Sequence, residues 1–240
     1  MRSPRSLLAL PAAIVLALGA AACGDDDALD DDAGTTTTTE VPADDGGTDG
    51  DGTGDAGTDD GGTAGPEAPE GWQVVEGDGV SIAAPADWRG LPLDVVAVSG
   101  EDLQEVLPDA DEALLGQVEQ VVRQGGVLLA FGPTVDGFTD NVNVLAMPVA
   151  ATLEQLEREA EVGMGQLGAE VGSIELVELP IGEAVRVRYT LVGQGSDGPV
   201  TIEGVQFYVP QEDTTYVMTV STRTDPAAVA DGMAASLRVG

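Results

Sequence analysis

Hydrophobic residues recur at helical spacing in three segments of the chain. The first segment begins at Pro108, the second follows Thr152, and the third begins at Asp225. Apolar residues recur there every three or four positions, as one buried face of a helix requires. They are Leu114, Leu115, Val118, Val121 and Val122, then Leu153, Leu156, Ala160, Met164 and Leu167, and finally Val229, Met233 and Leu237. We therefore predict three amphipathic helices, with a shorter one around Leu103 and Leu107.

The second and third helices carry signals at their ends. Thr152 and Gln155 have the spacing of a capping box, so the second helix is expected to begin after Thr152. Pro226 stands in the first turn of the third helix, where its missing N–H is not needed. Arg238 is expected to end that helix, because a positive charge there suits the helix dipole.

Alternating and continuous apolar runs predict strands around these helices. Residues 73–76 and 80–84 flank Gly77-Asp78-Gly79, which predicts a β-hairpin. Further strands are predicted at 91–98, 127–131, 141–147, 174–179, 184–192, 201–209 and 215–222. Because short turns join the last four, they are expected to be antiparallel neighbours. A mostly antiparallel sheet that is interrupted and closed by helices is an α+β layered domain.

Residues 1–22 have the pattern of a signal peptide. Two arginines precede an apolar run from Leu7 to Leu18, and the small residues Ala20 to Ala22 follow. The run is shorter than the roughly 20 residues that a membrane-spanning helix needs. The one cysteine of the chain, Cys23, comes next. This arrangement resembles the signal of a bacterial lipoprotein, which is cleaved between Ala22 and Cys23 and receives its lipid on the cysteine thiol.

Lipid attachment at Cys23 predicts an extracytoplasmic protein that is anchored to the cell membrane. Two acyl chains such as palmitate, each contributing about 0.8 kcal/mol per buried CH₂, hold a protein at a bilayer without a transmembrane helix. Three positions before the cysteine, where such signals usually carry Leu, Val or Ile, this chain has Ala20. The alternative interpretation is an ordinary exported protein whose cysteine is incidental.

Residues 23–70 lack the hydrophobic pattern of a folded segment. They are rich in Asp, Gly and Thr, and Leu29 and Val41 are their only large apolar residues. We predict a disordered acidic tether that charge repulsion extends. The window Asp49 to Asp60 has the ligand spacing of an EF-hand calcium loop. Without flanking helices, chance spacing is the favoured interpretation, and no metal site is assigned there.

Composition excludes several kinds of chemistry. The formal net charge is −34, histidine is absent, and all nine basic residues are arginines. Without His or Lys there is no Ser-His-Asp or Cys-His arrangement, no Schiff base and no phosphate-binding P-loop. Binding a polyanion requires a basic face, so nucleic acid is not expected as a partner. We expect no cofactor and no metal.

Several short motifs resemble one protein family. They are Gly79 to Pro85 followed by Trp88, Asn141 to Val144 before a helix, Arg188-Tyr189, Tyr216 and a terminal amphipathic helix. Together they are similar to the LpqN-type lipoproteins of actinobacteria, whose domain is similar in fold to the photosystem protein PsbP and the Ran-binding protein Mog. The resemblance implies an α/β/α sandwich over residues 71–240, with a mostly antiparallel sheet between helices. It also implies a non-catalytic binding or accessory role in the cell envelope.

Two arginines are the candidate binding residues of the domain. Arg186 and Arg188 alternate with Val185, Val187 and Tyr189, so both are expected to point away from the apolar face of their strand. They either pair with carboxylates such as Glu203 or form an anion or partner site. Trp72 and Trp88 either close the end of the sheet or stack on a ligand.

The sequence thus predicts a lipid-anchored binding protein of the cell envelope. Its partner is expected to be another envelope protein, a lipid or a glycan, and no residue is assigned as catalytic. The alternative is an envelope hydrolase that uses carboxylates with Ser or Thr, and the absence of His and Lys as general bases disfavours it.

Overall fold

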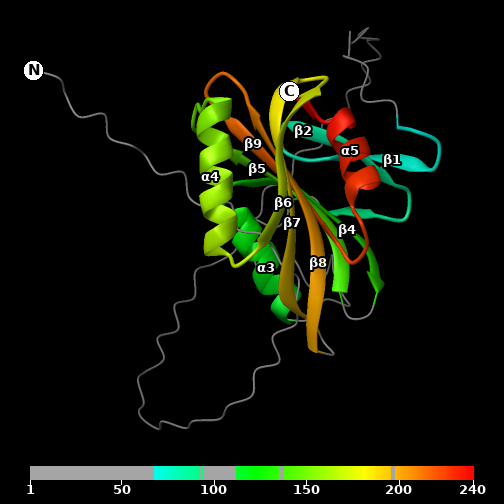
Figure 1. Cartoon of the computed structure of the whole chain (residues 1–240). Helices are drawn as coiled ribbons and strands as arrows, with labels where there is room; N and C mark the ends of the chain where they lie inside the picture. Colours follow the sequence, from blue (N-terminus) through cyan, green and yellow to red (C-terminus); the bar gives the residue numbers. More distant parts are fainter. Residues whose placement is uncertain (1–67, 92, 94–111, 136–137, 196–197) are drawn as a thin grey trace, which may run out of the picture. The chain divides into compact units, whose positions relative to one another are not determined.

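The largest element of the fold is a seven-stranded antiparallel sheet (Figure 1). The structure describes residues 68–91, 93, 112–135, 138–195 and 198–240. The structure is a computed structural model. The strands of this sheet lie in the order β3 (Arg89–Leu91), β4 (Gly126–Val135), β5 (Phe138–Met147), β9 (Thr215–Thr222), β8 (Gly198–Pro210), β7 (Gly182–Gly195) and β6 (Glu170–Leu179).

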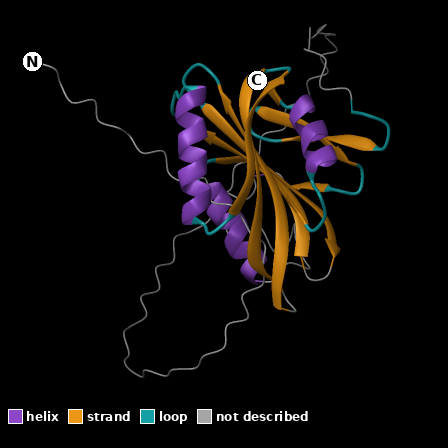
Figure 2. Ribbon diagram, in the orientation of Figure 1, coloured by secondary structure: helices purple, strands orange, loops and turns teal. Residues whose placement is uncertain are grey.

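A smaller sheet and several helices cover the large sheet (Figure 1). The small sheet contains β1 (Trp72–Glu76), β2 (Val80–Pro85) and β10 (Arg238–Val239), with β2 in the middle. The helices with described bounds are α3 (Glu112–Arg123), α4 (Leu153–Gln166) and α5 (Ala227–Ser236). All strand pairs described in the two sheets are antiparallel. The predicted α+β class, with helices on both faces of a mostly antiparallel sheet, is confirmed (Figure 2).

The two faces of the large sheet have different covers. α3 and α4 pack on one face, called here the α3/α4 face, while α5 and the small sheet pack on the other, called the α5 face (Figure 1). Side chains of a strand point alternately to the two faces. On β5, Val142 and Val144 therefore point to the α5 face, and Leu145 points to the α3/α4 face.

Local sequence signals explain most element boundaries. The capping box is present, because the N–H of Gln155 donates to Thr152 Oγ1 at 3.3 Å and the N–H of Thr152 donates to Gln155 Oε1 at 3.0 Å. The hairpin is present as β1 and β2, with Gly79 at φ +65° in its turn. The predicted strand at 91–98 is wrong at its start, because β3 ends at Leu91 and Leu93 is helical. Pro92 follows Leu91 and has no N–H for a strand ladder.

The predicted end of the last helix is also wrong. α5 ends at Ser236, and Arg238 and Val239 form β10, which pairs with Ser81 and Val80 of β2. The strand pairing supplies backbone hydrogen bonds that a longer helix would forgo. Arg238 Nη1 still donates to the carbonyl oxygen of Leu237 at 2.8 Å, so the residue contributes to the helix end from the strand that follows.

Several predictions lie outside the described residues. They are the signal peptide at 1–22, the tether at 23–70 up to residue 67, with its window at 49–60, the cleavage and lipid sites Ala22 and Cys23, and the short helix around Leu103. The boundary of the domain at 71–240 stays a prediction. No helix that the structure describes is both long and apolar enough to cross a membrane.

Candidate functional site

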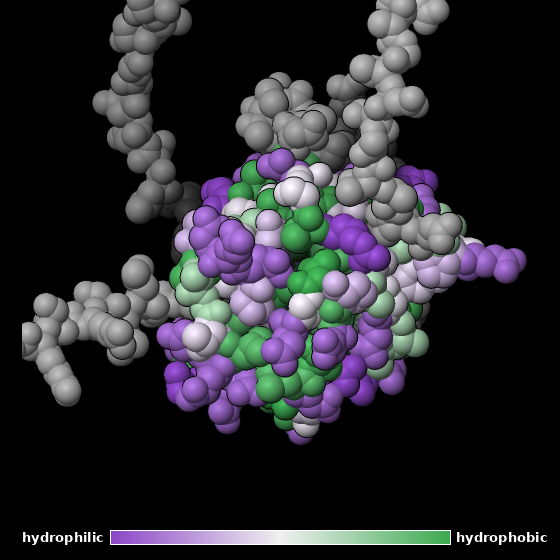
Figure 3. All heavy atoms as spheres, turned by 90° about the horizontal axis from the view of Figure 1, so that it is seen from above, coloured by the Kyte–Doolittle hydropathy of each residue, from purple (hydrophilic) through white to green (hydrophobic). Residues whose placement is uncertain are grey.

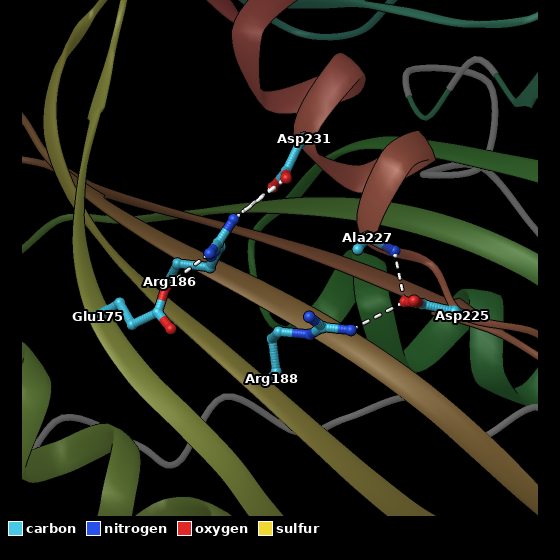
Figure 4. Close-up of polar contacts among 6 residues, drawn as sticks. All are labelled: Glu175, Arg186, Arg188, Asp225, Ala227 and Asp231. Atoms are coloured by element: carbon cyan, nitrogen blue, oxygen red, sulfur yellow. Dashed lines mark hydrogen bonds and ion pairs between the residues drawn. The ribbon is translucent and has the colours of Figure 1, made fainter.

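Arg186 and Arg188 lie on the α5 face of β7, beside the start of α5 (Figure 4). The strand alternation predicted from the sequence places both guanidinium groups on this face, while Val185, Val187 and Tyr189 join the apolar cluster of the opposite face. The two arginines therefore reach the same side of the sheet, as predicted. The structure gives them different surroundings.

Arg186 joins the sheet to α5. Its guanidinium donates to Asp231 of α5 at 2.9 and 3.1 Å and also donates to Glu175 on the neighbouring strand β6. The side chain is 22% exposed. The hydrogen bond to Glu175 raises the pKa of Arg186, and the same hydrogen bond lowers the pKa of Glu175. Arg186 is therefore a structural bridge as well as a surface charge.

Arg188 is more open to solvent. Its Nη2 donates to Asp225 Oδ1 at 2.9 Å, and its side chain is 42% exposed. The same oxygen accepts the backbone N–H of Ala227 at 3.0 Å, in the first turn of α5 (Figure 4). Asp225 thus holds both the helix start and the guanidinium. Because exposed ion pairs are weak, Arg188 is available to an anionic group that competes with Asp225.

An open pocket of about 370 Å³ lies beside Arg188. Its lining residues come from β6, β7, β8 and the residue before α5, and they are Gly172, Ser173, Arg188, Tyr189, Thr190, Glu203, Gly204 and Pro226. β6 shifts its register between Val171 and Ser173, so Gly172 bulges out of the ladder at the pocket. The pocket presents one guanidinium, one carboxylate and two hydroxyl groups, which can hold a polar or ionic group.

The predicted site residues therefore divide into three groups. Arg186 and Arg188 pair with Glu175, Asp231 and Asp225, whereas Glu203, named from the sequence as a partner, accepts a hydrogen bond from Thr190 Oγ1 at 3.4 Å. The tryptophans are part of the core. Trp88 is 5% exposed, and Trp72 packs against the apolar cluster of the α5 face, close to Gly232 of α5. Cys23 and Ala22 lie outside the described residues.

Polar groups characterise much of the surface. The exposed large hydrophobic residues in the described ranges come from β1, α4, β6 and β7, and they are Val74, Val162, Leu176 and Val192. Seen from above, hydrophobic residues lie in patches between hydrophilic ones (Figure 3). A partner approaching from that side meets charged and polar side chains together with small apolar patches.

The sequence analysis missed a set of buried polar residues on the α3/α4 face. Asn141 and Asn143, which alternate with Val142 and Val144 along β5, are only 1% and 0% exposed. The sequence signal that could have indicated this burial is the pair of predicted helices with apolar faces, because each such face must pack against a sheet. The structure shows that both sides of β5 are covered.

Comparisons with known proteins give a likeness of fold only. No protein-family model matches the chain, and no curated protein sequence matches it. The solution structure of cyanobacterial PsbP (CyanoP) from Synechocystis sp. PCC 6803 is similar at 16% identity and a TM-score of 0.45, covering 75% of this chain and 99% of that one. A crystal structure from Bacteroides thetaiotaomicron VPI-5482 is similar at 13% identity and a TM-score of 0.39, covering 68% of this chain and 45% of that one.

These matches bear on the resemblance noted from the sequence. A PsbP structure is found among the similar folds at low identity, while the actinobacterial LpqN-type lipoproteins are not among the matches described. Membership of that lipoprotein family therefore stays a prediction.

Proposed function

We propose that this protein is an exported lipoprotein, anchored through Cys23, whose folded domain binds another component of the cell envelope without catalysing a reaction. The proposed partner is an envelope protein, lipid or glycan that places a polar or anionic group in the pocket beside Arg188. The acidic segment at 23–70 would hold the domain away from the membrane, since charge repulsion extends such chains.

The observation that carries the proposal is the pocket beside Arg188. The chain has 43 acidic and nine basic residues, so a half-exposed guanidinium beside a pocket is a rare local feature. Arginine suits this role because its planar group binds carboxylates and phosphates through two parallel hydrogen bonds. Asp225 holds the group in place until a partner competes for it.

One contact favours the alternative hydrolase. Thr190 and Glu203 form a hydroxyl–carboxylate pair at the pocket. The separation of 3.4 Å is long for proton transfer, for which about 2.6–3.2 Å is usual. Within the described residues, no group of three His, Cys, Asp or Glu side chains is placed to hold a metal ion. Binding is therefore the better supported function.

The binding site is tested by capture of crosslinked membrane neighbours with matched arginine variants. Arg188→Gln should lower the yield of captured partner several-fold, because it removes the charge beside the pocket. Arg158→Gln is the control, since Arg158 is 65% exposed and pairs with Glu154 at 2.9 Å on α4, away from the pocket. Both variants should unfold within about 1 kcal/mol of the original protein. Equal capture by the two variants would reject the site.

The anchor and the non-catalytic role have separate tests. Cys23→Ala should release the protein from membranes into the medium, and the intact mass of the mature protein should show a lipidated Cys23 at its N-terminus. An unmodified Cys23, or a mature terminus elsewhere, would contradict the anchor. Turnover of an ester or glycan substrate that Glu203→Gln abolishes would replace the binding function by the hydrolase.

A further inference from the structure

Polar side chains form a continuous row inside the α3/α4 face. The row, called here the polar row, consists of Asn141, Asn143, Tyr189, Gln206, Thr219 and Ser221, all at most 2% exposed. The strand register sets their order. Asn141 lies opposite Ser221, and Asn143 lies opposite Thr219, which in turn lies opposite Gln206. The row therefore crosses the middle of the sheet at the spacing of its strands, which is about 4.8 Å.

Tyr189 completes the row across Gly204. Ser221 and Tyr189 both lie opposite Gly204, which has no side chain. The ring of Tyr189 occupies the space above Gly204, where an added Cβ would come within 2.0 Å of the ring. The hydroxyl group of Tyr189 is thereby buried on the same face as Ser221, and burial raises the pKa of Tyr189.

Part of the row is hydrogen-bonded and part is not. Gln206 Nε2 donates to Thr219 Oγ1 at 2.7 Å, and the hydroxyl group of Tyr208 donates to Gln206 Oε1 at 2.6 Å. Within the described ranges, no hydrogen-bond partner is found for Asn141 Oδ1, for both side-chain polar atoms of Asn143, or for the hydroxyl oxygens of Tyr189 and Ser221. Buried polar groups of folded proteins are almost always paired, so these amides need an explanation.

The row also divides an otherwise apolar layer. On one side, residues such as Leu145, Val185 and Val217 pack with α4. On the other side, Phe131, Phe138 and Ile202 pack with Val118 of α3. Apolar residues of similar size in the row would join the two clusters into one. The chain keeps amides and hydroxyl groups there although several of them gain no partner.

We propose that the polar row is a closed binding site for a neutral, hydroxyl-bearing small molecule such as a sugar, which reaches it when α4 moves off the sheet. Every member of the row is uncharged, and amides and hydroxyl groups offer both donors and acceptors. Ligand hydroxyl groups also donate and accept, so they match such a row, whereas an isolated ion would leave either the donors or the acceptors unpaired.

α4 is the part of the cover that opens. It packs on the sheet through Leu156, Ala160 and Met164. Its Glu159 is half-buried, yet Glu159 Oε2 is buried without a partner in the described part of the chain. A desolvated carboxylate without a partner disfavours the closed position of the helix. Glu159 also acts electrostatically on Tyr208, which is bonded to Gln206, so the row meets the edge of α4 there.

The test follows the side-chain amide signals of the full-length protein by NMR during titration with glucose, inositol and glycerol. At least one of these probes should shift the signals of Asn141, Asn143 and Gln206 in a saturable manner and leave the signal of Gln124, which lies outside α4, unchanged. Asn143→Leu should abolish the response and also raise the midpoint of thermal unfolding, because an apolar side chain of similar size replaces an unpaired amide. Gln124→Leu is the control and should retain the response.

Three outcomes would overturn the proposal. The first is no response of the polar row to any of the probes in the original protein. The second is a response that persists undiminished in Asn143→Leu. The third is a clear loss of stability in Asn143→Leu, which would make Asn143 a structural residue of the closed fold. The Arg188 pocket lies on the opposite face of the sheet, so the proposed function and this proposal can be rejected independently of each other.

Discussion

The two faces of the seven-stranded sheet come from the same strands but are buried differently. On the α5 face, β5 contributes Val142 and Val144, and the neighbouring strands contribute residues such as Phe207 and Val220 to one apolar cluster. On the α3/α4 face, β5 contributes Asn143 among fully buried residues. The α5 face therefore has one continuous apolar cluster, whereas the α3/α4 face has two apolar clusters and, between them, polar groups that gain little from the closed fold.

Charged groups show the same contrast. At the edge of the α5 face, Glu175 is bonded to Arg186, which lowers the pKa of Glu175. On α4, burial raises the pKa of Glu159, and the neighbouring Arg158 only partly opposes that rise. Ionisation of Glu175 therefore stabilises the fold, whereas ionisation of Glu159 destabilises it.

The largest expected effect is at the centre of the α5 face. Phe207→Ala should lower the free energy of unfolding by about 3–5 kcal/mol, because Phe207 is 1% exposed and leaves a cavity. Ser221→Ala on the opposite face removes one buried hydroxyl group and should cost less than about 1.5 kcal/mol. Urea unfolding compares the two variants. Equal losses would remove the contrast between the faces.

Gly204→Ala tests the close approach that positions Tyr189. The added Cβ would come within 2.0 Å of the tyrosine ring, so the ring must move, and a loss of about 1–3 kcal/mol is expected. Gly116→Ala in α3 is the control, because no atom lies within 4 Å of its new Cβ. It should gain up to about 1 kcal/mol of helix stability. An unchanged free energy of unfolding in Gly204→Ala would show that the tyrosine ring is free to move.

Arg186→Gln sharpens the difference between the two candidate arginines. The side chain of Arg186 is 22% exposed and bridges two carboxylates. The free energy of unfolding is therefore expected to fall by about 1–2 kcal/mol, which lies between the values for surface and buried ion pairs. Arg188→Gln should cost less than about 1 kcal/mol. Thermal unfolding of both variants measures the difference. The reverse order would make Arg188 the structural residue and Arg186 the better binding candidate.

The smallest effects are expected from the two glutamates, and they have opposite signs. At neutral pH, Glu175→Gln should destabilise the protein, and the difference should be lost as pH falls through the lowered pKa of Glu175, below its ordinary value of 4.5. Glu159→Gln should stabilise the protein at neutral pH. That gain should vanish as pH falls through the raised pKa of Glu159 towards 4.5. Unfolding curves at several pH values compare the variants, and a common sign would contradict this assignment.

The sequence predicted the parts of the fold that depend on local periodicity. The four C-terminal strands, the hairpin and the apolar stripes of α3, α4 and α5 follow from spacing within single segments. Residues 215–222 matched β9 at both ends. Pairings between distant segments were not predictable in this way, since spacing within a strand does not name its neighbour. The pairing of β5 with β9, and of β10 with β2, are examples.

The candidate site was predictable only in part. Alternation on β7 placed Arg186 and Arg188 on one face, but their partners lie more than thirty residues away, Asp231 in α5 and Asp225 just before it. The burial of Asn141 and Asn143 was not predictable from β5, because it depends on helices that approach from elsewhere in the chain.

Native-state hydrogen exchange of the backbone amides tests the central contrast between the two faces most directly. α4 carries the buried Glu159 Oε2, which has no partner within the described residues, whereas α5 covers an apolar cluster and is held by the ion pair of Arg186 with Asp231. The amides of Leu156, Ala160 and Met164 should therefore exchange through a partial opening whose free energy is lower than that of global unfolding. Those of Ala230, Met233 and Ala234 should exchange closer to the global value. Exchange of α4 only through global unfolding, with α5 opening first, would contradict the account.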